Sequence, residues 1–100
     1  MIHIKEGVRL HGIRPEMVLA LVIADQVYER LEHELVVTSV IDGKHSRTSL
    51  HYVGAASDLR LPGGDGIVVR DRIAHCLGPD YDVVLEDDHI HIEWQPKGMY

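Results

Sequence analysis

The chain has 100 residues, of which 45% are hydrophobic, and this is enough for one folded domain with a single core. Its formal net charge of −6 at pH 7 argues against nonspecific binding of nucleic acid, because such binding requires clustered Lys and Arg against phosphates. The longest apolar run, residues 17–24, is far shorter than the roughly 20 residues that cross a bilayer, so we expect no membrane partner.

The first ten residues lack the basic, apolar and small-residue order of a secretory signal. We therefore expect the protein to be cytoplasmic on synthesis. Cys76 is the single cysteine, which excludes an internal disulfide, and its apolar surroundings predict a buried structural thiol.

The first predicted helix follows Arg14-Pro15-Glu16 and continues over residues 17–34, about five turns, with proline in its first turn. Residues that share its inward face are Met17, Leu21, Ala24, Val27, Tyr28 and Leu31. Residues 34–42 are rich in β-branched side chains and end at Asp-Gly, which predicts a strand followed by a turn.

The middle of the chain predicts a strand, a loop and a short helix. Residues 57–61 alternate polar and apolar side chains, as a half-buried strand does, and the sequence PGGDG at 62–66 is typical of a loop. A second helix is predicted over 67–78, where Gly78 ends it. Its inward residues are expected to be Val69, Ile73, Cys76 and Leu77.

Two further strands are predicted at 82–86 and 89–94, joined by an acidic turn. These elements do not follow strict strand–helix–strand alternation. They therefore predict one α+β domain over residues 1–100, with an antiparallel sheet of about four strands, one long helix and one short helix.

The chain contains eight histidines, which is a high number for its length. Four lie in unrelated contexts that surface or core positions explain: His3, His11, His33 and His75. The other four, which are His45, His51, His89 and His91, lie in two stretches rich in polar residues. These two stretches are the candidates for a functional site.

The sequence HIHIEW at 89–94 alternates histidine with isoleucine, so a strand places both imidazoles on one face and both isoleucines on the other. Zinc binds imidazole nitrogens and carboxylate oxygens, and a catalytic site keeps one coordination position open. His51, Asp58 and one histidine of the pair His89/His91 would supply three ligands. Each half of this set is common by chance, and their joint occurrence raises the expectation of a zinc site.

Two motifs resemble those of a known family. The stretch SLHYVGAASD matches the pattern Ser-x-His-x-x-Gly-x-Ala-x-Asp at Ser49, His51, Gly54, Ala56 and Asp58. The stretch DHIHIEW resembles a second signature, an acidic residue three places before a histidine, at Asp88 and His91. Together they resemble the zinc D-alanyl-D-alanine carboxypeptidases and the related phage endolysin L-alanyl-D-glutamate peptidases, whose fold is the Hedgehog/DD-peptidase fold. The resemblance covers about residues 36 to 94.

The resemblance implies a role for each matching residue. It makes His51, Asp58 and His91 the zinc ligands and Asp88 the general base, with the metal lowering the pKa of water and polarising the scissile carbonyl. A regular strand would instead turn Asp87 toward the side of His91, so the choice of base between Asp87 and Asp88 stays open.

The neighbouring residues have supporting roles in this interpretation. His89 would stabilise the developing oxyanion or flank the metal. Ser49 would orient His51 or its loop, and Arg47 would bind a substrate carboxylate in two places. Gly54 and Ala56 have a structural interpretation, a tight turn and a close approach of two backbone segments.

Three functions follow as expectations. The first is a zinc peptidase that hydrolyses a bond involving a D-amino acid in a peptidoglycan stem peptide, in a phage or bacterial context. The second is a zinc-stabilised binding or virion structural protein of the same fold without turnover. The third is an α+β domain that binds no metal. The oligomeric state stays open, and a monomer is compatible with the sequence.

Overall fold

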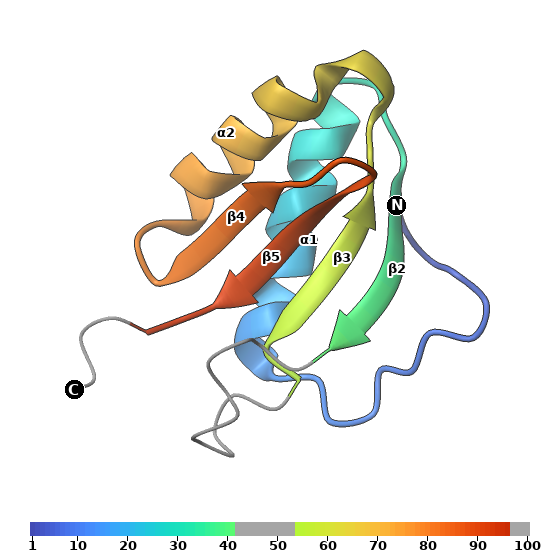
Figure 1. The fold of residues 1–100 in the computed structure, drawn as a ribbon, viewed down its shortest axis with the longest axis vertical. Coiled ribbons are helices and arrows are strands. Elements are labelled where there is room, and N and C mark those ends of the chain that lie inside the picture. The colour runs from blue at the N-terminus through green and yellow to red at the C-terminus, as the bar shows by residue number, and fades with distance from the viewer. Residues whose placement is uncertain (42–53, 97–100) are drawn as a thin grey trace.

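The computed structural model describes residues 1–41 and 54–96, and in these residues two helices cover one face of a five-stranded sheet (Figure 1). In chain order the elements are β1 (Ile2–Ile4), α1 (Pro15–Arg30), β2 (Leu35–Ile41), β3 (Ala56–Arg60), the 3₁₀ turn η3 (Gly63–Asp65), α2 (Gly66–Leu77), β4 (Tyr81–Leu85) and β5 (His89–Trp94). The predicted α+β class is confirmed, whereas the predicted Hedgehog/DD-peptidase fold stays a proposal. The predicted loop at 62–66 contains the 3₁₀ turn.

The sheet has the strand order β1-β2-β3-β5-β4. Strands β2, β3, β5 and β4 pair antiparallel, as predicted, but β1 adds a fifth strand that runs parallel to β2. The prediction of about four antiparallel strands is therefore wrong at this edge. Strand β1 has only three residues, and α1 separates it in the sequence from its partner residues Leu35–Val37. No local sequence pattern therefore indicates this strand.

Helix α1 begins with Pro15 in its first turn, as predicted, but it ends at Arg30 rather than at residue 34. Glu32 adopts a positive φ of 64°, and the amide of His33 donates to the carbonyl of Tyr28. The amide of Glu32 also donates to the carbonyl of Glu29. These bonds form a Schellman cap that stops the helix and turns the chain into β2.

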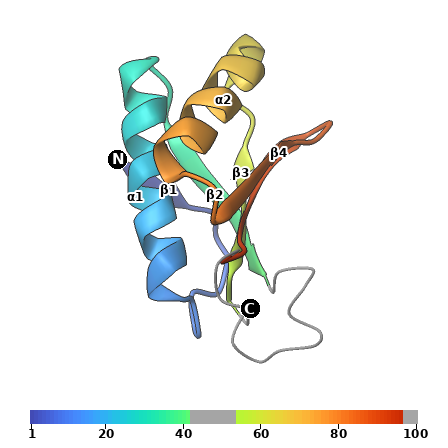
Figure 2. The same ribbon diagram turned by 90° about the vertical axis from the view of Figure 1, so that its left-hand side faces the viewer.

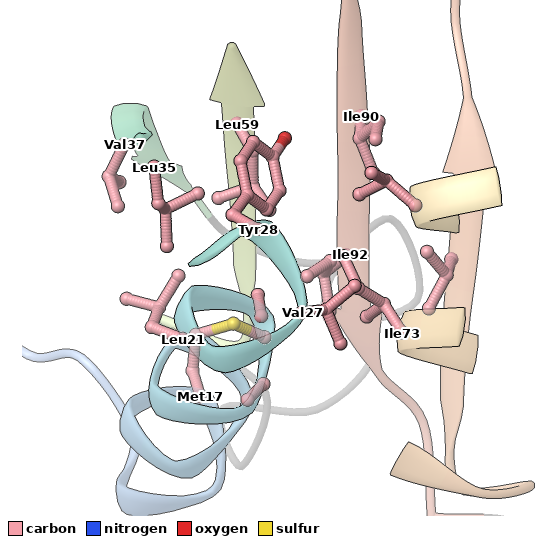
Figure 3. Close-up of a cluster of buried hydrophobic side chains, with 14 residues drawn as sticks. Met17, Leu21, Val27, Tyr28, Leu35, Val37, Leu59, Ile73, Ile90 and Ile92 are labelled. Atoms are coloured by element: carbon pink, nitrogen blue, oxygen red, sulfur yellow. The ribbon is translucent and has the colours of Figure 1, made fainter. Parts of the chain in front are cut away.

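The core lies between the two helices and the sheet, and Figure 3 shows Tyr28 and Met17 of α1 facing sheet residues such as Leu59 and Ile92. The predicted inward residues of α1 are buried except for Leu31, which is partly buried. Burial of apolar side chains is worth about 1.5–3 kcal/mol each, so this layer stabilises the packing of the sheet against the helices.

The prediction that Cys76 is buried is wrong, because its thiol is exposed. The buried stripe of α2 follows the four-residue spacing from Val69 to Ile73 and on to the partly buried Leu77. Cys76 follows Val69 by seven residues and so shares its side of the helix, but it lies in the last turn of α2, where its thiol is exposed.

The face of the sheet that points away from the helices carries polar residues of β5. Both helices lie on the same side of the sheet (Figure 2). Ile90 and Ile92 of β5 are fully buried in the core on that side. The strand period of two therefore turns His89, His91 and Glu93 to the opposite face, which confirms the predicted alternation.

Candidate metal centre

Asp58 and His91 face each other across the pairing of β3 with β5. The register aligns Asp58 with His91 between two buried pairs, Ser57 with Ile92 and Leu59 with Ile90. Oδ1 of Asp58 lies 2.8 Å from Nδ1 of His91. The two predicted zinc ligands within the described residues are therefore adjacent in the structure.

His89 completes a group of three possible ligands. It lies on the same face of β5 as His91, and its Nε2 is 3.5 Å from Oδ1 of Asp58. One potential ligand atom from each of Asp58, His89 and His91 lies within 4.8 Å of the others. The side chains are 21%, 30% and 11% exposed, so the group is accessible to a ligand without being fully solvated.

The donor set fits a transition metal ion. One carboxylate oxygen and two imidazole nitrogens are ligands that zinc accepts, and purely oxygen-binding cations such as Mg²⁺ are less suited to imidazole. Sequence reasoning selected one histidine of the pair as a ligand, whereas the structure brings both to the same carboxylate.

A bulge in β2 supplies hydrogen bonds to Asp58. The register between β2 and β3 shifts between Val37 and Ser39. The hydroxyl of Ser39 donates to Oδ2 of Asp58 at 2.9 Å, and that of Thr38 donates to the Asp58 backbone carbonyl at 3.2 Å. Ser39 thereby holds one carboxylate oxygen and leaves the other directed at the two histidines.

Glu93 contacts the second nitrogen of His91. Its Oε1 lies 3.1 Å from Nε2 of His91, and its Oε2 accepts a hydrogen bond of 2.6 Å from the side-chain amide of Gln95. Glu93 is only 3% exposed. Sequence reasoning missed this residue, although the period-two pattern that selected the two histidines also places Glu93 on their face.

Asp88, the predicted general base, lies just before β5, and its side chain is 88% exposed. Its Oδ1 lies 2.6 Å from Nδ1 of His89. This hydrogen bond lowers the pKa of Asp88 and raises the pKa of His89, whose charged form also interacts with Asp58. The role of Asp88 as a base stays a prediction, as does the alternative role of the exposed Asp87.

Three predicted site residues lie outside the described residues: Arg47, Ser49 and His51. Their predicted roles in substrate binding and zinc ligation therefore stay predictions. Gly54, which belongs to the same motif, confirms the predicted close approach of two backbone segments. It has a φ of 76°, and a Cβ built on it would lie 2.1 Å from the carbonyl oxygen of Gly12.

A pocket of about 430 Å³ adjoins the group, between β2 and the segment that follows β1. Its lining includes the two residues that hydrogen-bond Asp58, Thr38 and Ser39, and three charged residues, the cationic Lys5 and Arg9 and the anionic Glu6. Sequence reasoning did not single out either cation.

Neither helix of the described chain combines the length and the apolarity that a bilayer crossing requires. Comparison of the chain with models of protein families, with curated proteins and with solved structures gives no match. The chemistry of the site therefore carries the functional argument.

Proposed function

We propose that the chain is a zinc-dependent peptidase that hydrolyses a bond involving a D-amino acid in a peptidoglycan stem peptide. The observation that carries the proposal is the pairing of Asp58 with His91, with Oδ1 and Nδ1 2.8 Å apart. Each residue comes from a different one of the two motifs that resemble the zinc carboxypeptidases. The proposal takes His51, from outside the described residues, as a further ligand.

A bound zinc ion in such a site lowers the pKa of water and polarises a carbonyl group. The chain's own residues supply the rest of the proposed chemistry. Asp58 provides a negative charge at the site, and Ser39 orients it. In this proposal a ring N–H of His89 stabilises the developing oxyanion, unless His89 serves as a ligand.

Asp88 would receive the proton from the attacking water and pass it to the leaving amine. It is joined to the group through His89 Nδ1, 2.6 Å from its Oδ1. In this proposal the exposed Asp88 side chain leaves His89 and turns toward the reacting water to take up the proton.

The neighbouring pocket supports an anionic peptide as the substrate. Lys5 and Arg9 are exposed on the segment that lines it, beside Thr38 and Ser39, and they outnumber the one lining carboxylate, Glu6. Stem peptides carry carboxylates, and cationic side chains bind carboxylates through charge-assisted hydrogen bonds. A substrate held by its carboxylate in this pocket would lie next to Asp58.

The test is the release of amino groups from purified peptidoglycan, with mass spectrometry of the products to identify the bond. We expect His51→Ala and Asp88→Ala to abolish release, and Glu34→Ala, whose side chain is 79% exposed, to leave it unchanged. Asp87→Ala decides between the two candidate bases. Full cleavage by both His51→Ala and Asp88→Ala would contradict the proposal.

A second candidate function is a zinc-stabilised binding protein without turnover. The observation that favours it is the 88% exposure of the Asp88 side chain, whose carboxylate contacts His89. In that case removal of zinc lowers the melting temperature, while no peptide of the wall is cleaved at any zinc concentration.

A further inference from the structure

A buried carboxylate lies behind His91, on the side away from Asp58. Glu93 is 3% exposed, although a carboxylate without hydrogen-bond partners is costly to bury. Within the described contacts, its two oxygens meet His91 Nε2 at 3.1 Å and the Gln95 amide at 2.6 Å. The residues form a chain from Gln95 through Glu93 to the imidazole.

These hydrogen-bonded side chains give the two nitrogens of His91 different partners. Nδ1 faces Asp58 Oδ1 at 2.8 Å, and Nε2 faces Glu93. A neutral imidazole carries one N–H, and only its other nitrogen has a lone pair for a metal ion. If Nδ1 is the ligand atom, Nε2 must carry the proton, and Glu93 is the acceptor in place for it.

We infer that Glu93 is the positioning residue of the metal centre. It holds His91 in the tautomer with the proton on Nε2 and fixes the ring so that Nδ1 points toward Asp58. Gln95 holds Glu93 in turn through a hydrogen bond to Oε2. A carboxylate that orients a metal-binding histidine in this way also strengthens the histidine as a ligand. The inference rests on the proposed zinc site.

The other two possible ligands have partners of the same kind. Ser39 donates to the second oxygen of Asp58, and Asp88 contacts the second nitrogen of His89. Glu93 differs from both in its burial, since Asp88 is exposed and Ser39 is half-buried. A buried carboxylate cannot rotate away into water, so it fixes its histidine more firmly than an exposed one does.

The test measures the zinc affinity of the full-length protein by competition with a chromophoric chelator. Outer partners of metal ligands contribute about 10- to 100-fold to affinity, so we expect a loss in this range for Glu93→Ala. Glu93→Gln keeps an oxygen acceptor without the charge and should restore part of the affinity. Glu34→Ala removes an exposed carboxylate and serves as the matched control.

A second readout separates positioning from a merely structural role. Long-range ¹H–¹⁵N NMR spectra of the zinc-loaded protein should show His91 protonated at Nε2, and this signature should be lost in Glu93→Ala and kept in Glu93→Gln. If Glu93→Ala does not fold when metal-free, Gln95→Ala takes its place, and we expect it to weaken zinc binding severalfold.

The outcomes are distinguishable. Unchanged zinc affinity and an unchanged His91 spectrum in a folded Glu93→Ala protein, or in Gln95→Ala where that variant replaces it, would overturn the positioning role and leave the zinc site intact. An unsubstituted protein that binds no zinc would overturn the zinc site itself and the inference with it.

Discussion

Asp58 Oδ1 lies 2.8 Å from Nδ1 of His91, although the two residues are 33 positions apart in the chain. Their meeting follows from the antiparallel register of β3 with β5, in which they are direct partners. On one face of a strand pair, opposite side chains have Cβ atoms about 4.5–5.5 Å apart, which is close enough to share one ion. The pair is therefore the centre of every metal-binding prediction.

Asp58→Asn is expected to weaken zinc binding by more than about tenfold, because it replaces an anionic ligand with a neutral amide while keeping the shape of the side chain. The measurement is chelator competition at neutral pH. Asp71→Asn removes a carboxylate that is 61% exposed and is the control. Equal zinc affinities of the two variants would show that Asp58 is not a zinc ligand.

Asp88→Asn is expected to lower the pKa of His89 in the metal-free protein. The hydrogen bond to Asp88 raises the pKa of His89 above its ordinary value of 6.5, because it favours the charged imidazole. NMR titration of the His89 ring protons measures the change, and a midpoint that stays where it was would contradict it.

The same pair sets the sign of a pH effect on stability. Because the pKa of His89 is raised in the folded protein, its contribution to the free energy of unfolding is complete below pH 6.5. That contribution is lost as the pH rises through the higher pKa of the folded state. Because the pKa of Asp88 is lowered in the folded protein, its contribution to the free energy of unfolding is present above pH 3.8. That contribution is lost as the pH falls through the lower pKa of the folded state. The free energies of unfolding of the unsubstituted protein and of Asp88→Asn, measured by denaturation, should therefore differ most between pH 3.8 and pH 6.5.

Gly54→Ala is expected to lower the free energy of unfolding by at least about 2 kcal/mol. It adds a Cβ that would lie 2.1 Å from the Gly12 carbonyl oxygen at a φ of 76°, so backbone strain and overpacking act together. Gly63→Ala has a φ of 57° but no heavy atom within 4 Å of the added Cβ, so it reports the backbone strain alone. Urea denaturation of both variants gives the difference, and equal losses would exclude the clash.

Ser57→Ala is expected to leave stability unchanged or raise it by about 1 kcal/mol. Ser57 is fully buried, and among the described residues its hydroxyl has no hydrogen-bond partner. Removing a buried unsatisfied hydroxyl relieves its desolvation penalty. Ser39→Ala removes a hydrogen bond to Asp58 and should instead destabilise the fold. A clear loss of stability in Ser57→Ala would show that its hydroxyl is satisfied.

The sequence predicted the local elements well where one face of an element is apolar. The alternation in β5 placed the isoleucines in the core and the histidines on the other face, because successive side chains of a strand point to opposite sides. The helical spacing likewise predicted the buried residues of α1 except Ala20. It did not locate the end of α1, because Glu32 forms a cap in a left-handed conformation that its residue type does not favour.

What the sequence determined by itself was that the imidazoles of His89 and His91 share one face of a strand. The tertiary structure decided which residues meet them and what surrounds them. Strand register, the bulge that brings Ser39 to Asp58, and the parallel pairing that brings Lys5 and Arg9 near β2 all join segments distant in sequence. Such contacts depend on how the whole core packs, and periodicity within one segment reports only which side of that segment is buried.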